Sequence, residues 1–310
     1  MEELSEIRFN ENNIRLKNNL VRGPILPEKV SELNRDVTIQ GNTAIEGPVY
    51  ARKLEIQNGD LEICGAVFAQ LELYVNSEAE GNITFKKSVG SANSVVSRAA
   101  NCRLTFHSDI NAKSVTLYNA FVAGSVYADE IAIENSVVTG GVFATQQIDM
   151  TDSIAGTFNA PSVRIARSVG ILLPSAFSVE KIIVAPDTKF YNLSLADLGA
   201  LYKGLPQSPD SGKIEMNTDA DEIKSTLAND EVQRTLHAYT IVGKVLAADL
   251  SNPDKFQNHF LLTASSLGAQ LLKTYDMGMD CNGKPALLTI ERIRNFFFDV
   301  LHGKVTLREL

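Results

Sequence analysis

The sequence predicts a mainly β protein, in which a right-handed β-solenoid of about nine turns precedes a small α-helical domain. Three observations lead to this fold class. A pattern of glycine, apolar residue and alanine returns about every 16 residues, apolar and polar residues alternate over short stretches within it, and beyond Phe190 the apolar spacing becomes that of helices. We divide the chain into a lead-in segment (residues 1–30), a solenoid (31–190) and a helical domain (191–310).

The repeat is clearest in the middle of the chain, where successive copies start at a constant interval. The copies start at Ser108, Gly124, Gly140 and Gly156. The second residue after each start is apolar and the fourth is alanine: Ile110, Val126, Val142 and Phe158, and then Ala112, Ala128, Ala144 and Ala160. The apolar residues later in each copy alternate with polar ones, which is typical of short β-strands.

Further copies lie upstream. Gly47 and Gly65 start two copies at a slightly longer interval, and we assign a third start to Gly81, where the interval of the middle copies returns. The next start, Ser108, follows only after a much longer gap, so an irregular turn is expected there, with Phe85 at the position that is small elsewhere. Degenerate copies around residues 37–39 and 182–184 close the series at its two ends.

A solenoid follows because one copy is too short to bury its own apolar face. Parallel stacking of copies, about 4.8 Å apart, forms a continuous core. The competing left-handed hexapeptide helix needs an apolar residue at every sixth position. Here the apolar residues Val126, Ile131, Ile133 and Val137 are unevenly spaced, which excludes that register.

The line G-x-(I/V)-x-A-x-x-(I/V)-x-I, found at Gly47–Ile56 and Gly124–Ile133, resembles the repeat of the bactofilins, polymer-forming bacterial cytoskeletal proteins. The resemblance covers about residues 37–184 and implies a compact right-handed β-helix that assembles end to end without nucleotide. Unpaired main-chain groups on the terminal turns are the expected contacts. The candidate residues for self-association are Val37, Ile39, Ile45, Ile182, Ile183 and Val184.

The C-terminal segment departs from that family, whose tails are short and disordered. After a linker at 203–217, three apolar stripes at helical spacing predict a small helical bundle. The stripes are Val232, Leu236, Tyr239, Val242, Leu246 and Leu250; Phe256, Phe260, Ala264, Leu267 and Leu271; and Leu287, Ile290, Ile293, Phe297, Val300 and Leu301. We expect this domain to cap one end of the solenoid or to recruit a partner. Phe296, Phe297 and Phe298 either pack inside the bundle or form an exposed docking surface.

Composition restricts the function classes. The net charge of −8 argues against nucleic-acid binding, no apolar run is long enough for a membrane span, and the start of the chain lacks the features of a signal peptide, so a cytoplasmic location is expected. The three cysteines are far apart and are interpreted as reduced core thiols. GxSxG, Walker and GxGxxG motifs are absent. We therefore expect no cofactor, no metal and no enzymatic activity.

Several residues allow a second interpretation. His237 and His259 could bind a metal, although a structural role is expected, and His107 has no identifiable catalytic partner. Acidic residues along one flank (Asp129, Glu130, Glu134, Asp149 and Asp152) and an aromatic ladder (Tyr50, Phe68, Tyr127 and Phe143) suggest the alternative. That alternative is a carbohydrate-binding or carbohydrate-cleaving β-helix. The leading hypothesis remains a non-enzymatic, bactofilin-like scaffold that self-associates.

Overall fold

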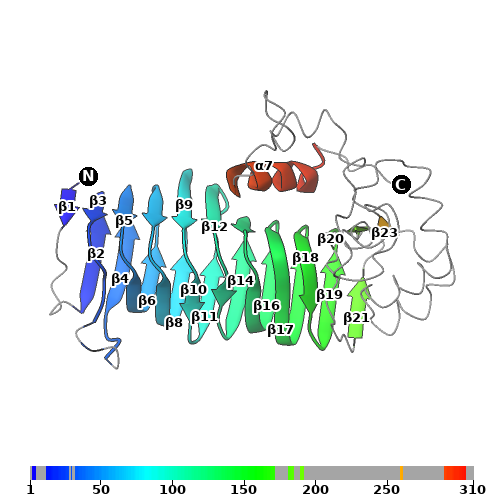
Figure 1. Cartoon of the computed structure of the whole chain (residues 1–310), viewed down its shortest axis with the longest axis horizontal. Helices are drawn as coiled ribbons and strands as arrows, with labels where there is room; N and C mark the ends of the chain where they lie inside the picture. Colours follow the sequence, from blue (N-terminus) through cyan, green and yellow to red (C-terminus); the bar gives the residue numbers. More distant parts are fainter. Residues whose placement is uncertain are drawn as a thin grey trace, which may run out of the picture. The chain divides into compact units, whose positions relative to one another are not determined.

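The computed structural model describes residues 2–4, 12–27, 29, 32–171, 181–184, 189–191, 259–260 and 290–304. The chain is mainly β and forms a parallel β-solenoid of about nine turns, which confirms the predicted fold class at this level (Figure 1). It divides into two compact units, Met1–Ser153 and Ile154–Leu310, which are described separately. In the described ranges, no helix has the length and apolar character needed to cross a membrane.

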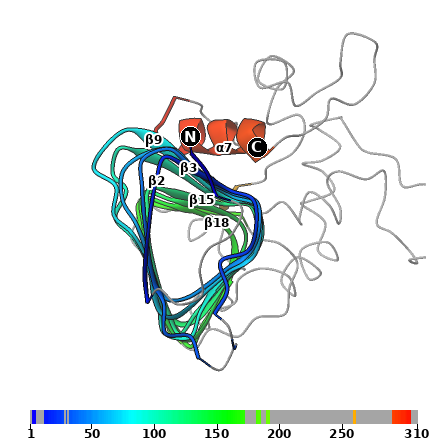
Figure 2. The ribbon, with the colours of Figure 1, turned by 90° about the vertical axis from the view of Figure 1, so that its left-hand side faces the viewer.

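Three parallel sheets make up the first unit, and its turns superimpose on three sides when viewed along the stack (Figure 2). The first sheet contains β2 (Asn13–Lys17), β4 (Asp36–Gln40), the second halves of β6 (Val49–Ile56) and β8 (Val67–Val75), β11 (Ser94–Ser97), β14 (Ser114–Tyr118), and the last parts of β16 (Val126–Glu134) and β17 (Val137–Thr151). The second sheet contains β1 (Glu2–Leu4), β3 (Asn19–Val21), β5 (Thr43–Ile45), β7 (Leu61–Ile63), β9 (Gly81–Phe85), β12 (Cys102–Phe106), β15 (Ala120–Val122) and the start of β17.

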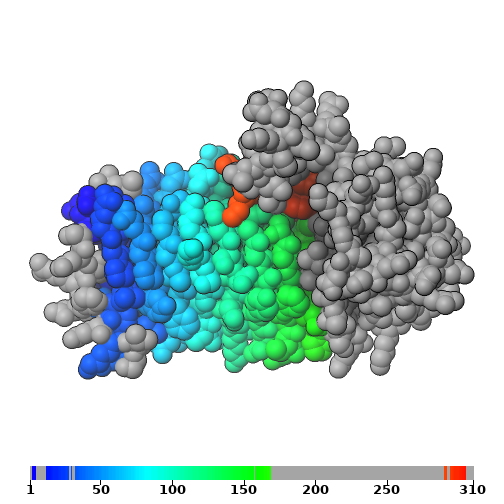
Figure 3. All heavy atoms as spheres, in the orientation of Figure 1, coloured from blue at the N-terminus to red at the C-terminus, as the bar shows by residue number. Residues whose placement is uncertain are grey.

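The third sheet contains the first halves of β6 and β8, then β10 (Val89–Ser91), β13 (Ile110–Asn111), the start of β16 and the middle of β17. Equivalent residues of successive turns stand in register, and the successive turns lie side by side as bands of colour in the space-filling view (Figure 3). The pairing of Ile110 with Val126, and of Val126 with Val142, confirms the predicted register of the middle copies.

The core fills the space between the three sheets. Alternate residues of each strand point inward, and these positions are occupied by valine, isoleucine, leucine and phenylalanine with almost no exposed surface. Phe85 and Phe106 stack face to face inside the solenoid, with ring centroids 4.8 Å apart and an interplanar angle of 2°. A single turn cannot bury its apolar residues alone, so the core exists only in the stacked state.

Residues with positive φ form the corner between the first and second sheets. In the first unit they are Asn18, Gly41, Gly59, Asn119, Asn135 and Asp152, with φ values of 58°, 64°, 121°, 54°, 46° and 45°. Asparagine, aspartate and glycine tolerate this conformation better than other residues do. The side-chain amide of Asn119 also donates hydrogen bonds to the carbonyls of Ala99, Ala100 and Cys102 in the preceding turn, at 3.1, 2.9 and 3.2 Å. The corner therefore joins turns through side chains as well as through strands.

The glycines that start the copies lie at turns, a position that suggests a positive φ, but they do not have one. Gly47, Gly65, Gly124 and Gly140 are absent from the positive-φ residues of the structure. A side chain at Gly65 would instead collide with the backbone of Gly47 and Pro48 in the preceding turn. Glycine is used at these positions because successive turns approach closely there.

Two predictions about the solenoid are corrected. Residues 81–111 are not an irregular turn, because β9, β10 and β11 occupy all three sheets there with parallel partners on both sides. Gly81 does not start a copy of the repeat, because the residues in register with Ile110 are Val89 and then Val67, not Ile83. The two turns between Val67 and Ile110 are therefore longer than those of the middle copies. The residue aligned with Ala69 is then Ser91, so Phe85 does not break the rule of a small residue.

The predicted lead-in segment is also part of the solenoid. β2 pairs with β4 from Asn13 to Lys17, and β3 pairs with β5 through Leu20 and Val21. Ile14, Leu16 and Val21 are buried in the core. The solenoid therefore begins well before residue 31.

In the second unit, β18 (Ile154–Asn159), β20 (Val169–Ile171), β22 (Lys189–Tyr191) and β23 (His259–Phe260) pair in parallel, and β19 (Ser162–Ala166) pairs with β21 (Lys181–Val184). The helix α7 (Ile290–Leu301) confirms part of the third predicted stripe. The first stripe and the linker lie outside the described residues. The second stripe is wrong at His259–Phe260, which form a strand on β22 because their main chain completes the ladder there.

Candidate assembly edge and surface ladders

At the N-terminal end of the first sheet, the outermost described strand is β2, and one side of its main chain is hydrogen-bonded to β4. The N–H of Asp36 donates to the carbonyl of Asn12 at 2.8 Å, and the N–H of Asn18 donates to the carbonyl of Gln40 at 3.4 Å. Because main-chain groups alternate in direction along a strand, Ile14 and Leu16 face β4, whereas Asn13, Arg15 and Lys17 face the other way. No strand among the described residues pairs with that second side of β2.

One main-chain N–H on this open side of β2 is hydrogen-bonded to a side chain. The outward N–H of Lys17 donates to Oδ1 of the buried Asn19 at 2.6 Å. Arg15, at the centre of β2, keeps an outward N–H and carbonyl without a strand partner in the described ranges. Arg15 is thus the residue through which a further strand could be added.

The outermost strand of the second sheet is β1. The N–H of Glu2 donates to the carbonyl of Asn18 at 2.9 Å, and the N–H of Arg22 donates to the carbonyl of Leu4 at 3.1 Å. These two bonds direct Glu2 and Leu4 toward β3, so the main chain of Glu3 between them faces outward. The N-terminal turn therefore presents two central edge residues, Arg15 and Glu3.

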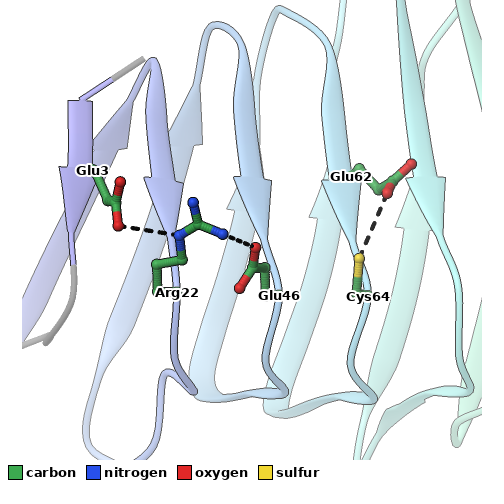
Figure 4. A network of polar contacts seen from close by, with 5 residues as sticks. All are labelled: Glu3, Arg22, Glu46, Glu62 and Cys64. Carbon is green, nitrogen blue, oxygen red and sulfur yellow. Dashed lines mark hydrogen bonds and ion pairs between the residues drawn. The ribbon is translucent and has the colours of Figure 1, made fainter.

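The charges at this edge differ between the sheets. Arg15 and Lys17 are exposed on β2, whereas Glu3 on β1 forms an ion pair with Arg22, at 3.1 Å, and Arg22 pairs with Glu46 at 2.7 Å (Figure 4). The hydrogen bond to Glu3, followed by the charges of both carboxylates, raises the pKa of Arg22. All three side chains are well exposed, so the network contributes little to stability and more to the local charge pattern.

The side chain of Cys64 forms a further polar cluster with Glu62 and Lys86. The thiol of Cys64 donates to Oε1 of Glu62 at 3.5 Å (Figure 4), and Nζ of Lys86 lies 3.2 Å from Oε2 of Glu62. Burial, and then the hydrogen bond to Glu62, raises the pKa of the Cys64 thiol, which therefore stays protonated near neutral pH. A protonated thiol is a poor nucleophile, so this arrangement does not support cysteine-based catalysis.

His107 gives the first testable prediction. Burial, and then the charge of Lys86, lowers the pKa of His107 from its ordinary value of 6.5. The unfolded chain then binds the proton more tightly, so the stabilising effect of neutral His107 is complete above about pH 6.5 and is lost as the pH falls toward the lower folded pKa. We expect the melting temperature to fall between about pH 7 and about pH 5. The slope should become smaller in His107→Gln, and an unchanged slope would contradict this assignment.

The aromatic ladder lies on the outer face of the third sheet but is interrupted. Tyr50 and Phe68 are 6.2 Å apart at 40°, and Tyr127 and Phe143 are 5.2 Å apart at 16°. Gly90 and then Asn111 occupy the two intervening positions of this column. Tyr127 is 40% exposed, but its ring is stacked on that of Phe143. Rings that cover each other are used for packing between turns and leave less face for a sugar.

The self-association residues predicted at the N-terminal end do not lie on an open strand edge. Val37, Ile39 and Ile45 are buried, and their strands, β4 and β5, are paired on both sides. They cannot be edge contacts, because β2 stacks beyond β4 and β3 stacks beyond β5. The sequence analysis did not identify Arg15 and Glu3 as edge residues, although the alternating run Ile14-Arg15-Leu16 indicates a further strand. At the other end, Ile182, Ile183 and Val184 lie on β21 and are in register with β19.

The predicted docking residues are largely enclosed. On α7, Phe296 and Phe298 are buried at 3% and 6% exposure, and Phe297 is half-buried. Phe296 packs edge-on against Phe297 at 5.2 Å, and the guanidinium of Arg294 lies 4.6 Å from the Phe298 ring centre. The three phenylalanines thus do not form one exposed surface, because two of the rings are buried.

The remaining site candidates are not brought together as a catalytic or metal centre in the part of the chain that is described. His259 lies on β23, and His237 is outside the described residues. No group of three or more His, Cys, Asp or Glu side chains within the described ranges is placed to hold a metal ion. On the acidic flank, Asp129 accepts a hydrogen bond from Thr145 at 2.6 Å. Comparisons with protein-family models, curated proteins and solved structures found no match.

Proposed function

We propose that this chain is a non-enzymatic, bactofilin-like scaffold protein of the cytoplasm that self-associates through the main-chain edge of its terminal turns. The solenoid turns in the right-handed sense in this proposal, and the C-terminal segment caps one end or recruits a partner. The observation that carries the proposal is the open side of β2, where Arg15 presents an N–H and a carbonyl without a strand partner in the described ranges.

Open strand edges favour the addition of further strands, because main-chain groups that are unpaired in the monomer become paired. The parallel ladder behind β2 is already ordered, so a second chain would extend an existing core with little further ordering of the first. The cations of Arg15 and Lys17 limit this reaction, since charged residues on an edge strand oppose indiscriminate pairing. The edge is therefore suited to a partner with a complementary charge.

Proline at position 15 tests the proposal, because it removes an N–H that faces away from β4 and leaves the internal ladder intact. We expect the full-length protein to form dimers or longer assemblies in sedimentation and electron microscopy, and Arg15→Pro to remain monomeric with an unchanged circular dichroism spectrum. Arg15→Ala should keep measurable assembly, because it retains the N–H.

Thr38, which pairs with Arg15 on β4, provides the control. Thr38→Pro removes a hydrogen bond inside the ladder and should lower the free energy of unfolding by about 1–3 kcal/mol. A wild-type protein that stays monomeric at every concentration, or an Arg15→Pro variant that assembles like the wild type, would overturn the proposal.

The second candidate function is carbohydrate binding, and the exposed ring of Tyr127 is the observation in its favour. The interruption of the ladder at Gly90 and Asn111, and the stacking on Phe143, count against it. Glycan binding that is lost in Tyr127→Ala would support this function over self-association.

A further inference from the structure

We propose that two copies of the chain meet through their N-terminal turns around a two-fold axis, with β2 of each copy antiparallel to β1 of the other. In this arrangement, Arg15 of one copy lies opposite Glu3 of the second copy, twice per dimer. The inference rests on the proposed function and specifies its partner: a second copy, in one orientation. Three independent properties of the edge select this arrangement.

The first property is the direction of the main-chain groups. Arg15 is the central residue of β2, Glu3 is the central residue of β1, and the main chain of each faces outward. A two-fold axis across the stack reverses the strand direction, so strands that meet at the interface are antiparallel. Two outward-facing residues placed opposite each other in antiparallel strands exchange both N–H···O bonds. Arg15 and Glu3 of the second copy can therefore form one complete hydrogen-bonded pair.

The second property is charge. Pairing β2 with a second β2 around a two-fold axis would place Arg15 against Arg15, and pairing β1 with a second β1 would place Glu3 against Glu3. Like charges directly opposite each other destabilise paired strands, and unlike charges stabilise them. Pairing β2 with β1 is the combination that joins a cationic strand to an anionic one. Arg22 occupies Oε1 of Glu3, and Oε2 has no hydrogen-bond partner among the described residues, so it is available to the incoming guanidinium.

The third property is the height of the two strands along the stack. β1 lies one rung beyond β3, which is about 4.8 Å, whereas β2 belongs to the turn that continues into β3. With three sheets per turn, β1 stands about 3 Å further out than β2. When β1 of each copy faces β2 of the other, the distance between the facing strands is the same at both contacts. If β1 paired with β1 and β2 with β2, the two copies would touch at the second sheet, where the strands stand further out, and leave a gap at the first sheet.

Charge reversal tests this arrangement with the full-length chain. Arg15→Glu and Glu3→Arg should each weaken the dimer by roughly tenfold or more, because two attractive pairs become repulsive. The combination of both substitutions restores unlike charges and should recover affinity to near the wild-type value. Arg98→Glu is the matched control, since Arg98 is exposed in the middle of the first unit, and it should leave the dimer unchanged. Dimer dissociation is measured by mass photometry and sedimentation, with circular dichroism to monitor folding.

The outcomes separate this inference from the proposed function. Loss in both single variants and recovery in the double variant support the two-fold pairing. If Arg15→Glu weakens the dimer and the double variant does not recover it, Arg15 does not face Glu3 of the second copy and the arrangement is wrong. If the wild type assembles but the single variants assemble equally well, self-association stands and this interface is overturned. A wild type that never assembles overturns both.

Discussion

Truncation of Phe106 to alanine is expected to be the most destabilising single substitution in the first unit. The ring has no exposed surface and stacks on Phe85 at 4.8 Å. Removing it loses the burial of the ring, loses the aromatic pair and leaves a cavity that the flanking strands cannot close, because their hydrogen bonds fix the spacing of the turns. We expect the free energy of unfolding to fall by about 3–5 kcal/mol.

Urea unfolding followed by circular dichroism measures this change. Phe106→Leu should have a clearly smaller effect, because it keeps most of the buried volume. Tyr127→Ala is the matched aromatic control on the outside, where the ring is 40% exposed. Equal losses for Phe106→Ala and Tyr127→Ala would contradict the placement of the core.

The second large effect is expected at Asn119, where the corner depends on both backbone and side chain. Its φ is 54°, and its amide group donates to three carbonyls of the preceding turn. Asn119→Ala loses these bonds and places a residue with a Cβ in a conformation that disfavours it. We expect a loss of about 2–4 kcal/mol in the free energy of unfolding.

Two companion variants separate these contributions. Asn119→Gly restores the backbone preference and should recover about 1 kcal/mol of the loss. Asn119→Asp has nearly the same shape but presents oxygens to the three carbonyls, so it should destabilise at least as much as alanine does. Near-wild-type stability in Asn119→Asp would show that the three hydrogen bonds do not contribute.

The sequence predicts the solenoid well where the turns have constant length. From Ile110 through Val126 to Val142, glycine, apolar residue and alanine recur at one fixed interval because each corner is equally tight. Between Val67 and Ile110 the corners are longer, so the same structural position recurs later than the fixed interval predicts and is misplaced by it. A glycine at 81 then starts a strand of the second sheet, not of the third.

The open edge of β2 could not be identified from the repeat in the same way. Val37 and Ile39 have a clear apolar alternation near the start of the repeat series, but β2 covers them with a strand whose outward residues are Arg15 and Lys17. An edge is defined by main-chain groups that lack partners, and nearly every residue type carries those groups. Only the register of the surrounding strands shows which residues present them.

The register of the ladder has a consequence for how the chain folds. In the described part of the first unit, strands pair with strands one turn away, as β10 does with β13 and β13 with β16. The sequence separations between partners are therefore a small fraction of the chain length. β proteins usually fold slowly because their partners are distant in sequence. Here each pairing closes only a short loop, so folding can begin at any stable pair of turns and proceed turn by turn along the axis. The outermost turns have a neighbour on one side only, so they are the first to unfold.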